Sequence, residues 1–142
     1  MKASIRLHLD VPYFIGNIDK TPFDANQKEV RDDNLPPPFE NHYIFAATQR
    51  EPDLSYREIR IILPKSLEYK TYRLTDAENP VHVEYISEAG SDINVYKGIE
   101  GTIELFESHE SNAVAATFKV KVEDDNHDTE LDIDGSFDML LP

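Results

Sequence analysis

From Val114 to Val122 the sequence reads VAATFKVKV, and this stretch decides the fold class. Its large apolar side chains recur at every second position, with residues such as Lys119 between them. A two-residue period is typical of a β-strand that buries one face and exposes the other. We therefore predict a half-buried strand here.

The stretches on either side, residues 99–105 and 131–139, alternate in the same way. Two polar segments, expected at 107–112 and 123–128, are the connecting loops. Strands joined by loops this short are normally antiparallel neighbours. The sequence thus predicts a three-stranded meander at the C-terminal end.

The register of this meander follows from keeping apolar side chains on one face. With the loops at the expected places, Phe118 lies opposite Ile133 on one side and Gly101 on the other. The Phe118 ring then covers the bare backbone of Gly101, as aromatic rings often do beside strand glycines.

Strand patterns continue upstream, at residues 5–11, 13–15, 42–48, 56–63, 71–74 and 81–86. We predict an all-β fold, either an antiparallel β-sandwich or an up-and-down, lipocalin-like barrel of about 8–9 strands. The length fits a single domain over residues 1–142. Residues 17–41, which include three consecutive prolines, are expected to form a long Pro-rich loop.

Four short stretches carry a resemblance: TYRL (71–74), GIEGTIEL (98–105), AATF (115–118) and IDGSFD (133–138). They resemble the G-T-Y-x-L, G-T-I-x-I, G-T-F and D-G-S-F patterns of uncharacterised small bacterial β-domain families, many of which are lipoproteins. Lys70 and Ala116 stand where those families have glycine, and the lipidated cysteine is missing. The resemblance, over about residues 56–140, implies an all-β fold and no particular activity.

The chain carries 28 acidic and 14 basic residues, a formal charge of −14. Residues 99–142 contain 12 of the acids but only 2 lysines. Such a surface repels nucleic acid and anionic membranes. There is no cysteine, no apolar run of membrane-spanning length and no signal-peptide pattern. We expect a soluble protein without membrane insertion, cytoplasmic by default and secreted or periplasmic if a preceding segment has been removed.

No established catalytic or metal-binding motif is found, so we expect no cofactor and no catalytic or metal site. Asp124, Asn126 and Asp128 have the opening spacing of a calcium loop, but Thr129 and Gly135 then occupy the positions of its essential Gly and Glu. Whether His8, His42 and His82 converge across strands is left open. The candidate binding residues are the acids on the polar face of the last strand: Glu130, Asp132, Asp134 and Asp138.

Two functions are favoured over a third. The first is a non-catalytic binding module for a small or polar ligand. The alternative is an acidic protein-interaction or inhibitor/immunity-type module that neutralises a basic protein partner, for which the charge of the last third would steer association. An enzyme is the third and least supported possibility, because no nucleophile, acid–base pair or phosphate loop is recognisable.

Overall fold

The computed structural model describes residues 11–66, 68–126 and 128–142, which form ten β-strands. None of these residues belongs to a helix long and apolar enough to cross a membrane. In chain order the strands are β1 (Tyr13–Ile18), β2 (Thr21–Asp24), β3 (Gln27–Arg31), β4 (His42–Arg50), β5 (Tyr56–Pro64), β6 (Thr71–Arg73), β7 (His82–Ala89), β8 (Asp92–Glu107), β9 (Ala113–Asp124) and β10 (Glu130–Leu140). The strand predicted at 5–11 falls almost wholly outside the described residues.

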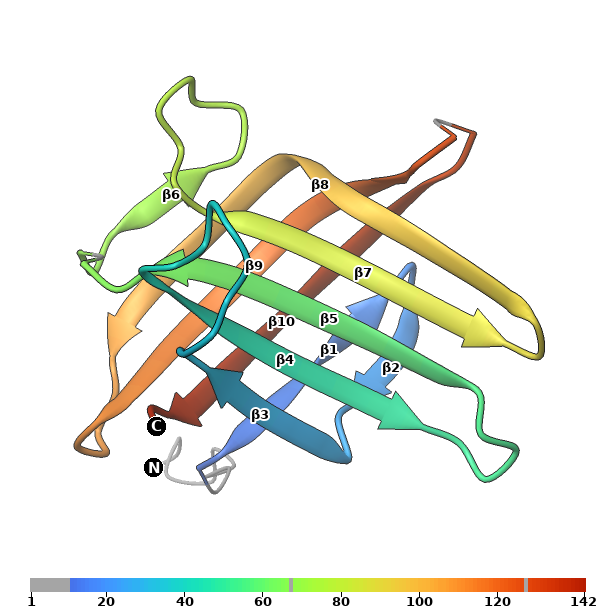
Figure 1. The fold of residues 1–142 in the computed structure, drawn as a ribbon, viewed down its shortest axis with the longest axis horizontal. Coiled ribbons are helices and arrows are strands. Elements are labelled where there is room, and N and C mark those ends of the chain that lie inside the picture. Colours follow the sequence, from blue (N-terminus) through green and yellow to red (C-terminus); the bar gives the residue numbers. More distant parts are fainter. Residues whose placement is uncertain (1–10, 67, 127) are drawn as a thin grey trace, which may run out of the picture.

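All strands pair antiparallel in one sheet, in the order β2-β1-β10-β9-β8-β7-β5-β4-β3, with β6 added beside β8. The sheet curls on itself (Figure 1), so that β3, β4, β5 and β7 form a front layer across β1, β2, β9 and β10. The 16-residue β8 turns the corner between the two layers. The all-β class and the C-terminal meander are confirmed, and the molecule is a curled half-barrel.

The two edge strands of the sheet, β2 and β3, are joined by only Ala25 and Asn26. This link bridges the layers: the Ala25 amide donates to the Phe14 carbonyl on β1 (3.2 Å), and the Asn26 amide donates to the Thr48 carbonyl on β4 (2.9 Å). The Asn26 side chain also bonds the backbone of Arg50 in both directions. The link therefore holds the two ends of the sheet together.

Phenylalanine rings fill the space between the layers. Phe14 stacks on Phe137 with ring centroids 5.1 Å apart, and Phe137 lies 5.1 Å from Phe45 on the front layer. Phe14 also contacts Phe23 and Phe118, at 6.1 and 5.6 Å. Side chains thus occupy the barrel interior where a lipocalin-like barrel would hold its ligand, so a binding site must be sought on the outside.

The segment predicted to be one loop, residues 17–41, contains the two short strands β2 and β3. The prediction failed there because β2 includes Pro22 and β3 (QKEVR) has a single apolar residue, so neither shows an apolar alternation. Both lie at sheet edges, where such residues are tolerated. The connecting loop proper is confined to residues 32–41.

The predicted register of the meander keeps the correct faces but is wrong by two residues. Phe118 pairs with Gly135 and Ile103, not with Ile133 and Gly101. In the β9–β10 hairpin the carboxylate of Asp124 accepts hydrogen bonds from the amides of Asp128 (2.8 Å) and Thr129 (3.2 Å). The loop begins two residues later than expected, at residue 125, and the β9–β10 pairs are shifted by two.

Candidate functional site

A row of side chains crosses the outer face of the front layer. The strand registers place Glu29, Ala46, Arg60, Glu84 and Lys97 side by side on β3, β4, β5, β7 and β8. Ala46 is the only small residue in this row, and it lies between the long side chains of Glu29 and Arg60. Its small side chain leaves a hollow between them.

This hollow, the Ala46 depression, has a volume of about 530 Å³. It is lined by Gln27, Lys28, Glu29, Arg31, Ile44, Ala46, Thr48, Arg50, Glu58 and Arg60. Four of these residues are basic and two are acidic, and of the basic ones Lys28 alternates with Glu29 and faces the same side of β3 as the core-packed Val30. Its size is in the range of small-molecule sites, although such sites are usually more apolar.

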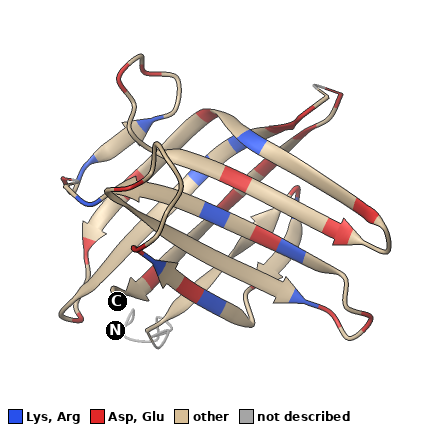
Figure 2. Ribbon diagram, in the orientation of Figure 1, with Lys and Arg blue, Asp and Glu red and all other residues tan. Residues whose placement is uncertain are grey.

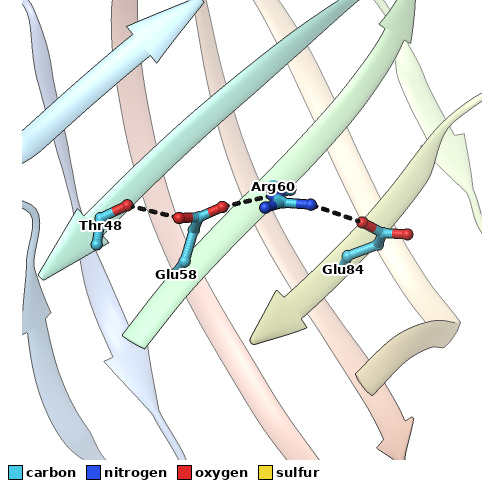
Figure 3. A network of polar contacts seen from close by, with 4 residues as sticks. All are labelled: Thr48, Glu58, Arg60 and Glu84. Atoms are coloured by element: carbon cyan, nitrogen blue, oxygen red, sulfur yellow. Dashed lines mark hydrogen bonds and ion pairs between the residues drawn. The ribbon is translucent and has the colours of Figure 1, made fainter. Parts of the chain in front are cut away.

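One wall of the depression is a connected polar network, drawn in Figure 3. The Thr48 hydroxyl donates to a carboxylate oxygen of Glu58 (2.8 Å), and Arg60 donates from Nε to the other oxygen of the same carboxylate. Arg60 Nη1 lies 3.7 Å from Glu84 on β7. The guanidinium is thus held between two carboxylates, and its orientation is fixed before any ligand arrives.

The other basic residues of the depression differ in their surroundings. The Arg50 guanidinium lies 4.8 Å above the ring of Tyr56. Lys28 donates to the backbone carbonyl of Ala25 (3.3 Å). Arg31 is exposed and forms no ion pair with any described residue. Figure 2 shows basic and acidic positions close together along β3 and along β5. Arg31 is therefore the basic side chain most open to a ligand.

The four acids predicted as binding residues all lie on the outer face of β10, in the back layer. Asp132 and Asp134 line a shallow hollow of about 360 Å³ together with Asn17, Asp19 and Lys20 of the β1–β2 hairpin. Glu130 lies apart, with its carboxylate 3.8 Å from Lys121. The Asn17 side chain donates to Asp134 (3.2 Å).

Asp138 does not belong to this solvent-facing group. It is buried, and its two carboxylate oxygens lie 2.8 and 2.9 Å from the Ser108 hydroxyl, which donates to it. The same Ser108 oxygen accepts from the amide of Glu110. Asp138 thus fixes the β8–β9 loop against β10, a structural role.

Of His8, His42 and His82, the structure brings His42 and His82 close to each other. The ring of Phe39 lies between His42 and His82, with centroids 5.2 and 5.3 Å away. Partial burial lowers the pKa of His82, the nearby His42 lowers it further, and Glu84 opposes both effects. His8 lies outside the described residues. Among the described residues, no three His, Asp or Glu side chains are grouped closely enough to hold a metal ion.

The sequence reasoning missed the Ala46 depression because its residues come from three strands and look ordinary on each. Ala46 reads as one more apolar residue of β4, and Glu58 and Arg60 read as the solvent side of β5. Comparison with protein-family models, curated proteins and solved structures finds no match. The resemblance to small bacterial β-domain families stays a prediction, and function is argued from the site alone.

Proposed function

We propose that this protein is a non-catalytic binding module that holds a small, polar, anionic ligand in the Ala46 depression. The observation that carries the proposal is the charge of the outward-facing lining: Arg31, Arg50 and Arg60 against Glu29 and Glu58, on a chain with twice as many acids as bases. A local excess of basic side chains on an acidic protein favours a carboxylate or phosphate group at that point.

The geometry supports a binding role in two further ways. Arg60 is held in place by Glu58 and Glu84, so a ligand need not immobilise it. Arg31 stands across the hollow without an ion pair among the described residues, and its guanidinium can bind an acidic group through two hydrogen bonds. A ligand between them would have its acidic group beside Arg31 and its remaining polar atoms near Gln27 and Arg60.

Filling the depression tests the proposal. Ala46→Leu places a bulky side chain in the hollow, and we expect it to weaken binding of a small polyanion such as citrate at least tenfold, which corresponds to about 1.4 kcal/mol. The change should leave the melting temperature nearly unaltered, because Ala46 is half-exposed and exposed enlargements are tolerated. Amide chemical-shift titration at low ionic strength with citrate, inorganic phosphate, guanidinium and a neutral sugar measures the effect.

The matched control is Ala115→Leu, the same enlargement at a half-buried position of β9 in the back layer. It should leave binding unchanged, and Arg31→Gln should weaken it like Ala46→Leu. Shifts that spread evenly over the protein, or that are unaffected by Ala46→Leu, would reject the site. A response to guanidinium but not to the anions would reject its proposed charge.

A second candidate function is favoured by the hollow at the β1–β2 hairpin. There Asp19, Asp132 and Asp134 line the hollow, with Lys20 as the one lysine among its lining residues, an arrangement that would steer a basic protein toward this face. This is the acidic protein-interaction module, and the observation supporting it is independent of the Ala46 depression.

Neutralising two acids tests this alternative. The register places Asp132 opposite Lys121 and Asp134 opposite Lys119, so a lysine at either position would put like charges across the strands. Asp132→Asn with Asp134→Asn is the cleaner change. For a basic partner such as poly-lysine, we expect slower association, a weaker salt dependence and a nearly unchanged melting temperature. Association rates that ignore both the substitutions and the salt would exclude this face.

A further inference from the structure

Residues 32–41 cover part of the outer face of the front layer. Leu35 is buried and Phe39 half-buried, and both pack on Ile44 of β4 and Ile62 of β5, forming a small cluster separate from the main core. Since this face otherwise carries polar side chains, the segment shields an apolar stripe that would be exposed without it.

Few polar contacts between described residues connect this segment to the strands beneath it. Lys65 Nζ lies 3.5 Å from the Asp32 carboxylate and donates to the backbone carbonyl of Asp32 at 3.2 Å. The Lys65 amide donates to the Asn41 carbonyl (2.9 Å). Within the segment, the Phe39 amide donates to the Pro36 carbonyl (2.9 Å). A segment with so few buried contacts can open locally at low free-energy cost.

The imidazoles of His42 and His82 flank the Phe39 ring, each inclined steeply to it, at 76° and 66°. The Nδ1 atom of His42 is buried and has no hydrogen-bond partner. A proton on that nitrogen would be a buried donor without an acceptor, which is costly. Docking of Phe39 against His82 helps to bury that imidazole, and burial favours its uncharged form.

The charged groups around the two imidazoles come from several elements. They are Glu84 on β7, Asp76 in the β6–β7 loop, Lys97 on β8, Lys65 after β5 and Glu40 in the segment itself. Among the described residues, none of the carboxylates forms an ion pair with either imidazole. Glu84 is already engaged by Arg60. Charge on the imidazoles is therefore not offset by a direct partner.

We propose that residues 32–41 are a pH-dependent clasp, docked on β4 and β5 while His82 is uncharged and released when His82 acquires a proton. The pH dependence of docking follows from the difference in proton binding between the docked and released states. With the clasp released, the pKa of His82 returns toward its ordinary value of about 6.5, and with it docked the pKa is lower. The released state binds more protons, so docking is at full strength above that pH and weakens as the pH falls below it.

Release of the clasp would change the neighbouring depression. Ile44 is both the surface on which Leu35 packs and one wall of the Ala46 depression. Opening would extend that polar hollow into the apolar stripe of Ile44 and Ile62. The clasp would therefore alter what the outer face can bind, whether or not the ligand proposed above is correct.

Hydrogen exchange tests the clasp without any ligand. We expect the protection factors of the Phe39 and Lys65 amides to fall at least roughly threefold between about pH 7.5 and about pH 5.5. The upper limit is a fall of about tenfold per pH unit for each proton that is taken up on release. The Ala116 amide in β9 is the internal control and should keep its protection. In the double variant His42→Gln, His82→Gln the pH response should disappear while the clasp stays docked.

An unchanged protection of Phe39 and Lys65 across this pH range would overturn the proposal, as would an equal fall in the double variant. Titration of the imidazole resonances is the second measurement and holds even if the double variant folds poorly. The pKa of His82 should lie below its usual range in the intact chain and rise in Phe39→Ala. Equal values in the two chains would also overturn it.

Discussion

Phe118→Ala is expected to lower the free energy of unfolding by about 3–5 kcal/mol. Phe118 is 4% exposed and its ring contacts Phe14, which in turn stacks on Phe137. Removing the ring leaves a cavity beside Phe14, between that ring and the backbone of Gly135. Chemical denaturation followed by circular dichroism measures the loss.

Lys119→Ala, one residue along the same strand, is the control. Its side chain is exposed on the outer face, and we expect a cost of about 1 kcal/mol or less. If the two substitutions cost the same, Phe118 does not have the central packing role assigned to it.

Gly16→Ala is expected to cost at least about 3 kcal/mol, the upper end of overpacking effects. Gly16 of β1 lies directly opposite Gly135 of β10. A Cβ on Gly16 would overlap the Asp134 carbonyl oxygen and lie 2.7 Å from the Gly135 Cα, so the two backbones would have to separate. A side chain on Gly135 would meet the tip of the Phe118 ring at 2.9 Å. Thermal unfolding of the variant measures the effect.

Gly90→Asn serves as the matched control. Gly90 is in the β7–β8 turn with φ of +63°, and a Cβ there meets nothing within 4 Å. Asparagine tolerates this backbone conformation better than most residues. The substitution should therefore cost little, and a loss as large as that of Gly16→Ala would show that the close approach of β1 and β10 is not the cause.

Where a strand buries one face and exposes the other, its alternation was enough to find it. Eight of the ten strands lie where such patterns predicted them, and the VAATFKVKV stretch indeed buries Phe118 and exposes Lys119. Strands β2 and β3 were not predicted, because edge strands can form without apolar alternation. Their presence depends on tertiary pairing with β1 and β4, which local sequence does not encode.

Register was less predictable than face. The period of two fixes which side chains point inward but allows shifts by two residues. At the β9–β10 hairpin the observed register goes with a turn that Asp124 caps. The same limit explains the glycine assignment. Gly135, not Gly101, lies beneath the Phe118 ring, although the principle that an aromatic ring covers strand glycine was correct.

The candidate site could not be predicted for the same reason, because the local sequence does not give strand register. The acids of β10 could be read as one polar face, but only the tertiary structure separates the buried Asp138 from the solvent-facing Asp132. The Ala46 depression needs the registers of three strands at once, since Glu29, Ala46 and Arg60 become neighbours only when β3, β4 and β5 are aligned.

The pairing of β1 with β10 constrains the order in which this chain can fold. Every other pair along the central part of the sheet joins strands that are close in sequence, whereas Tyr13 must find Asp138. Closing so large a loop costs entropy that local hairpins avoid. During synthesis, the hairpins from β4 to β9 can form as they leave the ribosome. Strand β1, with the apolar Phe14 exposed, must wait until β10 has been made, so the newly made chain is most prone to aggregation in that interval.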